Sequence, residues 1–283
     1  MARIVIITHE FDHFLRRRWP FFVKTSAFQI FDVMRELQRR GHTVILQQGL
    51  ARAAEGDAAL LHVDSTVVPQ DYVDYAARFP VCLNLATADI SKRRISGALL
   101  SRGDDWPGPV IVKTDLNRAG LAESRHYRHA LRAGRPLPGP MPPAPADYKV
   151  YESLSLVPET AFDDPALIVE RFLAEPEPDG FAARFWLFCG DRGRCARYVA
   201  SSRIAKGKDT LRSEEVQVPD QLRAIREKLG FDYGKFDFVM HDGQAILLDA
   251  NRTPGRPRAL RKRLEEGAPA LADGFEQVMR ARG

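Results

Sequence analysis

The sequence predicts a two-part fold, an α/β segment with a parallel sheet followed by an α+β segment with an antiparallel sheet. In the first part, short apolar runs alternate with helical patterns, which is typical of parallel strands joined by helical crossovers. From Pro107 onward the alternation ends, and apolar runs follow one another with little helical pattern between them. The length of 283 residues suits two domains. We expect them at residues 1–90 and 91–283.

Hydrophobic patterns assign the elements of the first part. Residues 3–7 form a β-branched run, and apolar residues then recur every three positions from Phe28 to Leu37 until Gly41 ends the helix. Further strands are expected at 43–46, 58–63 and 81–85, with a helix at 71–79. This alternation predicts a small Rossmann-like domain. No G-x-G-x-x-G pattern follows the first strand, so a dinucleotide site of the usual kind is not expected.

The loop after the first strand carries four ionisable residues, His9, Glu10, Asp12 and His13. Loops at the carboxyl ends of parallel strands often hold ligands, so these side chains could face a substrate. Solvated loop charges are the more common arrangement, and we expect that arrangement here.

The second part begins with an apolar strand at 110–113 that closes on Lys113. Six prolines between Pro136 and Pro145 exclude regular structure and predict an extended surface loop. Strands are then expected at 167–173, 181–188 and 198–204, in one antiparallel sheet. A helix is expected at 222–229, ended by Gly230.

Residues 235–251 predict a β-hairpin around an Asp-Gly pair. A two-residue turn would place Asp237 and Asp249 on opposite faces among apolar neighbours, and would bury unpaired charge. A three-residue turn, with its last residue Gly243 left-handed, gives one apolar face and gathers Asp237, Asp249 and Asn251 on the other. We therefore expect the three-residue turn. Oxygen ligands so placed suit Mg²⁺ together with phosphate oxygens and water, although polar side chains facing solvent would give the same alternation.

Asp237 and the run Leu-Asp-Ala-Asn-Arg-Thr-Pro-Gly at 248–255 resemble the metal-binding end of ATP-grasp enzymes, such as D-alanine:D-alanine ligases and glutathione synthetases. The resemblance implies three Mg²⁺ ligands, Asp237, Asp249 and Asn251, with Asp249 standing where those ligases have a glutamate. It also implies that the backbone N–H of Gly255 stabilises an oxyanion. Lys235 stands where the D-alanine ligases carry an arginine near the transferred phosphate, so the charge is kept but the two-pronged geometry is lost.

Two upstream segments extend the resemblance to about two thirds of the chain. The strand 109–113 resembles the family strand whose terminal lysine, here Lys113, contacts ATP phosphates. The strand 169–173 resembles the segment that reads adenine, through the carboxylate of Glu170 and the main chains of Arg171 and Leu173. Two further ATP contacts are implied by position, Glu177 for the ribose hydroxyls and Lys92 as a second phosphate-binding lysine.

The sequence also departs from the family pattern. After Lys113 the family has a glycine-rich loop over the phosphates, whereas residues 114–120 contain one glycine. Lys92 lies only 21 residues before Lys113, so the small subdomain of the ATP-grasp domain is expected to be abridged. Four basic residues could supply compensating charge: Arg118, Arg184, Arg203 and Lys206.

Composition excludes several other classes of protein. Three cysteines form no C-x-x-C pair, which argues against a zinc site and for a reducing compartment. No apolar run approaches the ~18 residues of a membrane span, and no signal-peptide pattern is present, so we expect a cytoplasmic protein with no membrane contact. The net charge of +5 suits anionic ligands of any kind.

The resemblance implies a ligase that uses ATP and Mg²⁺ to activate a small-molecule carboxylate as an acylphosphate and joins it to an amine. An ATP-grasp kinase that releases a phosphorylated product is an alternative. A third alternative, a nucleotide- or nucleic-acid-binding protein, is suggested by a basic cluster, Arg252, Arg256, Arg258, Arg261, Lys262 and Arg263. No stacking aromatics are interleaved with the cluster, so we do not expect nucleic acid as a partner. The sequence does not decide whether the protein forms a homo-oligomer.

Overall fold

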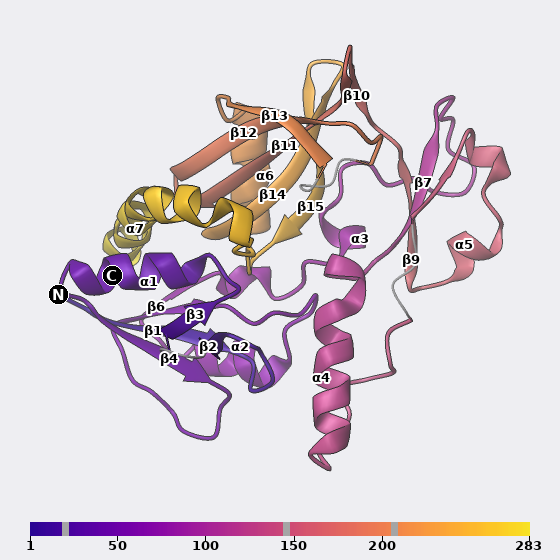
Figure 1. Cartoon of the computed structure of the whole chain (residues 1–283). Coiled ribbons are helices and arrows are strands. Elements are labelled where there is room, and N and C mark those ends of the chain that lie inside the picture. The colour runs from indigo at the N-terminus through magenta and orange to yellow at the C-terminus, as the bar shows by residue number, and fades with distance from the viewer. Residues whose placement is uncertain (19–22, 144–147, 205–208) are drawn as a thin grey trace.

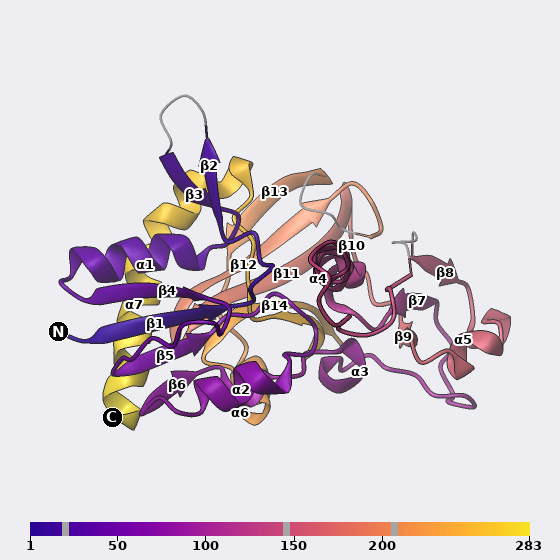
Figure 2. The same ribbon diagram turned by 90° about the horizontal axis from the view of Figure 1, so that it is seen from below.

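A computed structural model describes residues 1–18, 23–143, 148–204 and 209–283 of the chain, which is traced in Figure 1. The first part contains a parallel sheet of four strands in the order β4-β1-β5-β6. These are β1 (Arg3–Thr8), β4 (Thr43–Gln48), β5 (Ala58–Leu61) and β6 (Val81–Leu83). The predicted parallel sheet is therefore confirmed. A hairpin of β2 (Leu15–Arg18) and β3 (Val23–Ser26) extends away from this sheet (Figure 2).

The two faces of the parallel sheet are covered by different helices. Ile4 and Ile6 of β1 pack in one core with α1 (Ile30–Arg39) and α7 (Arg261–Arg282), which lie side by side (Figure 1). The intervening Val5 and Ile7 face α2 (Gln70–Ala76) in a second core. The alternation of β1 side chains between two apolar layers follows from the strand period of two.

The second part is built on an antiparallel sheet in the order β13-β12-β11-β14-β15. Its strands are β11 (Gly180–Cys189), β12 (Arg192–Ala200), β13 (Thr210–Glu215), β14 (Tyr233–His241) and β15 (Gln244–Asn251), with β10 (Glu175–Glu177) paired to β11. One face packs on α6 (Asp220–Leu229) through an aromatic core that includes Trp186 and Phe236. As predicted, Gly230 ends α6; it does so in the left-handed conformation.

The opposite face of this sheet packs on α7, which thereby joins both parts of the molecule. Gly274 lies so close to β11 that a Cβ atom there would sit 1.9 Å from the carbonyl oxygen of Cys189. The close approach requires glycine at this position. Because one core includes residues from both parts, such as Ile4 and Phe275, the boundary at residue 90 stays a prediction.

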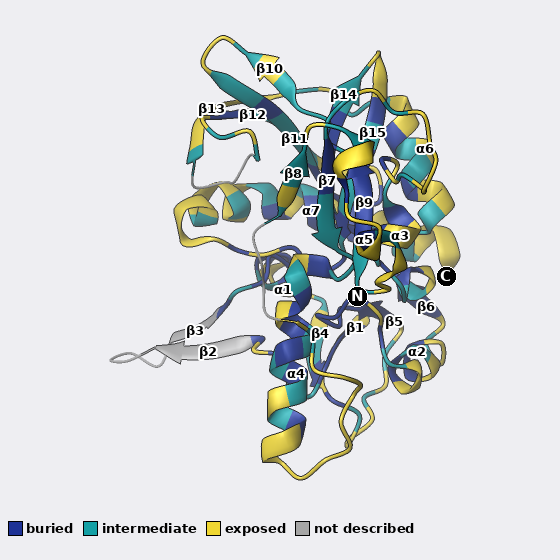
Figure 3. Cartoon of the chain, turned by 90° about the vertical axis from the view of Figure 1, so that its right-hand side faces the viewer, coloured by how far each residue is buried: buried dark blue, intermediate teal, exposed yellow. Residues whose placement is uncertain are grey.

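A small sheet in the order β8-β7-β9 lies beside the large antiparallel sheet, and its strand β9 is largely buried (Figure 3). It contains β7 (Val110–Thr114), β8 (Lys149–Tyr151) and β9 (Leu167–Arg171). The helices of this region are α3 (Lys92–Ile95), α4 (Leu121–Arg132) and α5 (Thr160–Asp163). Single 3-10 turns occupy Leu85–Thr87, Asn117–Gly120, Leu154–Leu156 and Arg258–Leu260.

Some sequence expectations for the second part are wrong. The strand at 167–171 pairs with β7 and not with the 180–189 strand, so the predicted single antiparallel sheet is in fact two sheets. The strand expected at 198–204 begins at Arg192 and ends at Ala200. Strand pairing between distant segments is a tertiary choice that hydrophobic periodicity does not encode. The described part of the proline-rich segment, 136–143, contains no helix or strand, and residues 144–147 lie outside the described chain.

All three cysteines are buried and free. None of the helices within the described ranges is long and apolar enough to cross a membrane.

Candidate functional site

A cavity of about 370 Å³ lies between the small sheet and the hairpin of β14 and β15. Its volume lies in the range of ordinary small-molecule sites. Eight of the eleven predicted site residues line it: Lys92, Lys113, Glu170, Arg171, Leu173, Lys235, Asp237 and Asp249. Arg184 and Arg203 line it as well, which makes basic side chains more numerous than acidic ones around the cavity. An excess of positive charge in a recess favours a polyanionic ligand.

The hairpin that carries the two aspartates turns with two residues, so the predicted three-residue turn is wrong. His241 pairs with Gln244, and the residues between them, Asp242 and Gly243, have φ angles of 48° and 74°. Two successive positive φ angles define a type I′ turn, which Asp-Gly strongly favours. The left-handed conformation predicted for Gly243 is confirmed.

A two-residue turn alone would place Asp237 and Asp249 on opposite faces of the sheet, but a β-bulge in β15 brings them back to one face. Phe238 pairs with Leu247, but Asp237 pairs with Asp249, so Leu248 is an extra residue in β15. The extra residue reverses the alternation beyond it, and both carboxylates line the cavity while Phe238 remains in the core. The conclusion that the aspartates share one face is thus correct although the register used to reach it is not. A bulge leaves no mark in a pattern of apolar and polar residues.

The two carboxylates have different partners. Lys235 Nζ donates to both oxygens of Asp237, at 2.6 and 2.8 Å. Asp249 Oδ1 is buried and accepts no hydrogen bond from any residue that the structure describes; Lys92 Nζ is its nearest cation, at 3.8 Å. Burial raises the pKa of Asp249 above its usual value, and the charge of Asp237 adds to that rise against the opposing effect of Lys92.

A buried carboxylate oxygen without a partner fits a cation ligand, because buried polar atoms are otherwise satisfied. Within the described residues no group of three or more His, Cys, Asp or Glu side chains is placed to hold a metal by itself. Mg²⁺ commonly binds through only one or two carboxylates and completes its shell with phosphate oxygens and water. The pair Asp237 and Asp249 fits that pattern, and does not fit a metal held by protein ligands alone.

Two lysines reach the cavity from separate elements. Lys113 ends β7, where it forms an ion pair with Glu170 of β9, whose side chain is 1% exposed. Lys92 begins α3, and its Nζ donates to the carbonyl of Leu116 at 2.6 Å. Burial lowers the pKa of Lys92, which means that its charge gains from an anionic partner. Both ammonium groups can therefore serve an anion in the cavity.

The segment predicted to read adenine lies along the cavity wall. The Arg171 N–H is already committed to the Ala98 carbonyl, at 2.8 Å, and its guanidinium donates to Gly97 at 2.7 Å. The Leu173 N–H donates to no described residue. The predicted pair of main-chain contacts would thus use the carbonyl of Arg171 and the N–H of Leu173, and it stays a prediction.

Three predicted residues do not line the cavity, and their roles stay predictions. Glu177 accepts hydrogen bonds from Arg212, at 2.8 Å, and from Arg197. Asn251 Oδ1 accepts the N–H of Thr253 at 2.8 Å. Gly255 pairs with Phe28 of the first part, and its N–H is free of bonds to the residues described.

The segment that replaces a glycine-rich loop has an unusual backbone. Arg118, Ala119 and Gly120 are consecutively left-handed, with φ angles of 48°, 54° and 71°, and α4 begins directly after them. For the first two residues this conformation is strained. Of the residues expected to supply compensating charge, Arg184 and Arg203 line the cavity and Arg118 does not, while Lys206 lies outside the described residues.

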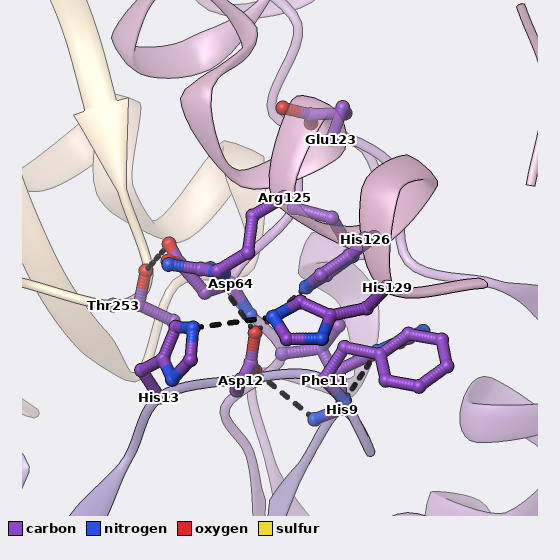
Figure 4. A network of polar contacts seen from close by, with 12 residues as sticks. His9, Phe11, Asp12, His13, Asp64, Glu123, Arg125, His126, His129 and Thr253 are labelled. Atoms are coloured by element: carbon purple, nitrogen blue, oxygen red, sulfur yellow. Dashed lines mark hydrogen bonds and ion pairs between the residues drawn. The ribbon is translucent and has the colours of Figure 1, made fainter. Parts of the chain in front are cut away.

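The loop after β1 belongs to a buried polar network, so the expectation of solvated charges is wrong for His9 and Asp12 (Figure 4). Asp12 Oδ1 lies 2.8 Å from His126 Nε2 and 3.3 Å from Arg125 Nη2, both on α4. The His9 ring stacks on His126 with centroids 3.9 Å apart. Burial, with His126 adding, lowers the pKa of His9 to about 4, so this ring is neutral at pH 7.

Asp64, which follows β5, connects the network to the loop after β15. Arg125 Nη2 donates to Asp64 Oδ2 at 2.7 Å, and Thr253 Oγ1 donates to Asp64 Oδ1 at 2.9 Å (Figure 4). Burial is the largest single influence on Asp64 and opposes its ionisation, but the hydrogen bonds from Arg125 and Thr253 and the charges of Arg125 and Arg118 together outweigh it, and the pKa is lowered. Sequence reasoning missed the network because its members come from four segments that periodicity cannot place together.

Two members of the basic cluster hold the fold together. The guanidinium of Arg252 is fully buried and donates to the carbonyls of Val63 and Thr66 at 3.2 and 3.1 Å, and also to those of Ser65 and Thr87. Arg256 is buried against Asp32, with Nε 2.6 Å from the carboxylate. Neither side chain is available to a nucleic acid.

Two solved structures of D-alanine–D-alanine ligase from Bacillus anthracis are similar to the whole chain. The complex with ATP has a TM-score of 0.50 and 15% identity, over 100% of this chain and 97% of that one. The second has a TM-score of 0.50 and 14% identity, over 99% and 97%. A RimK domain ATP-grasp protein from Sphaerobacter thermophilus DSM 20745 gives 0.48 and 15%, over 96% and 99%. No family model matches the sequence, and no curated protein matches it. The chain has an ATP-grasp fold, as the sequence resemblance predicts.

Proposed function

We propose that the protein is an ATP-dependent ligase that activates a substrate carboxylate as an acylphosphate and joins it to an amine-type nucleophile. The observation that carries the proposal is the pair Asp237 and Asp249, opposite each other in the cavity of an ATP-grasp fold, which Lys92, Lys113 and Lys235 also line. One of the similar ligase structures contains ATP, which is consistent with a nucleotide in this cavity.

In the proposed reaction, an oxygen of the substrate carboxylate attacks the γ-phosphorus of ATP and ADP leaves. The amine then attacks the acyl carbon, inorganic phosphate leaves, and the amine loses a proton. Catalysis of such a transfer rests on positioning and on neutralising charge. Lys92, Lys113 and Lys235 hold phosphate oxygens, and the N–H of Gly255 stabilises the oxyanion that forms when the amine attacks.

Asp237 and Asp249, with Asn251, would hold the Mg²⁺ that accompanies ATP. When bound, the ion neutralises the charge of the phosphate oxygens. Lys235 already donates to the Asp237 carboxylate, so its ammonium would lie beside the ion and could also meet a phosphate oxygen. Glu170, Arg171 and Leu173 form the adenine end of the site.

The proposal is tested by measuring ADP release with pooled amino acids and small carboxylic acids, with and without hydroxylamine. A ligase releases ADP only with the acid present, and hydroxylamine captures the acylphosphate as a hydroxamate. ADP release with a stable phosphorylated product would instead support the kinase. Salt-sensitive binding to DNA or RNA without any ATP turnover would support the nucleic-acid alternative and contradict the ligase.

A further inference from the structure

Thr253 lies between two hydrogen-bond acceptors on different parts of the molecule. Its Oγ1 is 2.9 Å from Asp64 Oδ1 and 3.1 Å from Asn251 Oδ1. Its backbone N–H donates to the same oxygen of Asn251, at 2.8 Å. Thr253 is 1% exposed and Asp64 is 2% exposed, so water does not readily replace these bonds.

Asp64 and Asn251 compete for the single hydroxyl hydrogen of Thr253. An amide oxygen accepts two hydrogen bonds, and the Thr253 N–H occupies one position on Asn251 Oδ1. The hydroxyl has a single hydrogen, which it can give to Asn251 or to Asp64. An ionised carboxylate is the stronger acceptor, and Asp64 is also the nearer one. Arg125, 2.7 Å from the other carboxylate oxygen, holds that group in place.

We propose that Asp64 and Thr253 are positioning residues for the proposed cation ligand Asn251. Asp64 accepts the hydroxyl hydrogen of Thr253, which leaves one lone pair of Asn251 Oδ1 free for the cation. The inference rests on the proposed function, in which Asn251 is a metal ligand. It assigns to the first part of the chain a role in cation binding, exerted through a single hydrogen bond. Groups that orient a metal ligand in this way typically change metal affinity by roughly 10–100-fold when altered.

Asp64→Asn separates this role from a purely structural one. Arg125 requires an acceptor, so the introduced amide turns its oxygen toward Arg125 and its NH₂ toward Thr253. The hydroxyl of Thr253 then accepts from that amide and must donate its own hydrogen to Asn251. Both lone pairs of Asn251 Oδ1 are then occupied, and cation binding weakens.

The experiment measures ADP binding by calorimetry, once with excess Mn²⁺ as the probe cation and once with EDTA. We expect Asp64→Asn to weaken ADP binding about 10-fold with Mn²⁺ and to leave binding in EDTA unchanged. In a Thr253→Val background, where no hydroxyl hydrogen exists, Asp64→Asn should have little further effect. Asp64→Glu, which keeps an ionised acceptor, should retain most of the Mn²⁺ dependence and serves as a second variant if Asp64→Asn folds poorly.

Arg125→Gln is the matched control, because it breaks the same ion pair but leaves the Asp64 carboxylate beside Thr253. It should lower the unfolding temperature as Asp64→Asn does, without the loss of Mn²⁺-dependent affinity. An equal loss in Asp64→Asn with and without the Thr253 hydroxyl would overturn the inference and leave the proposed function standing. A wild-type protein whose ADP affinity does not depend on Mn²⁺ would overturn both.

Discussion

Lys113→Met should damage both stability and turnover, for reasons that the structure separates. The ammonium of Lys113 is the ion-pair partner of Glu170, whose carboxylate is 1% exposed. Removing one member of a buried pair costs roughly 3–5 kcal/mol, because the remaining charge stays buried without compensation. For a domain of this size that corresponds to a fall in Tm on the order of 10 °C.

The same change should slow turnover by roughly 10²–10³-fold if Lys113 stabilises charge on the transferred phosphate. Adding Glu170→Gln removes the uncompensated charge and should recover stability without recovering turnover. Urea unfolding and a coupled assay of ADP release measure the two effects. Lys149→Met, at an exposed position of the neighbouring strand β8, is the control for a surface lysine of the same sheet. Wild-type turnover in Lys113→Met would mean that Lys113 does not stabilise the transferred phosphate. A stability equal to that of Lys149→Met would mean that its ion pair with Glu170 is not a buried one.

Three further changes test how the fold supports the site. Gly274→Ala forces a Cβ against the carbonyl of Cys189 and should lower the free energy of unfolding in urea by about 1–3 kcal/mol. Gly267→Ala, in the same helix, has open space around it and should be neutral or stabilising. Equal effects of the two changes would contradict the packing of α7 on β11. Arg252→Met leaves several buried carbonyls without a donor and should lower the unfolding free energy by roughly 3 kcal/mol; a loss below about 1 kcal/mol would mean that water replaces the guanidinium. Burial lowers the pKa of His62 to about 4, so stability present above pH 6.5 should fall by about 3 kcal/mol as the pH drops toward 4, and His62→Phe should remove that loss when unfolding is measured across this range.

The parallel sheet could be predicted because each of its strands is a local pattern with a helix or loop of ordinary length behind it. The run of residues 3–7 and the spacing from Phe28 to Leu37 depend only on near neighbours in sequence, and the corresponding elements are present at 3–8 and 30–39. Pairing between β7 and β9 could not be predicted, because it joins segments more than 50 residues apart.

The aspartate pair illustrates a correct conclusion drawn from a wrong register. Parity in the sequence excluded a two-residue turn, since that turn alone would separate Asp237 from Asp249. The structure contains both the two-residue turn and a bulge at Leu248, and together they restore the shared face. The sequence pattern indicates that both carboxylates must lie outside the core. It does not indicate which turn and which bulge place them there.

The network around Asp12 and Asp64 could not be inferred at all. His126 and Arg125 lie on α4, a helix whose buried face is largely small or polar and therefore gives little hydrophobic signal. The individual residues resembled solvated charges, and only their juxtaposition at the carboxyl ends of β1 and β5 makes them a buried network.

In the proposed reaction, the hairpin face with Asp249 binds the metal of MgATP. The most direct test is calorimetric titration of a non-hydrolysable ATP analogue, with Mg²⁺ and with EDTA, into the wild type, Asp249→Asn and Asp242→Asn. The last makes the same chemical change at the exposed tip of the same hairpin, where Asn is compatible with the left-handed backbone. We predict that Mg²⁺ strengthens binding to the wild type and to Asp242→Asn, and that Asp249→Asn loses roughly 10-fold or more of this Mg²⁺-dependent affinity. Undiminished Mg²⁺-dependent binding to Asp249→Asn would mean that this face of the hairpin does not bind the metal.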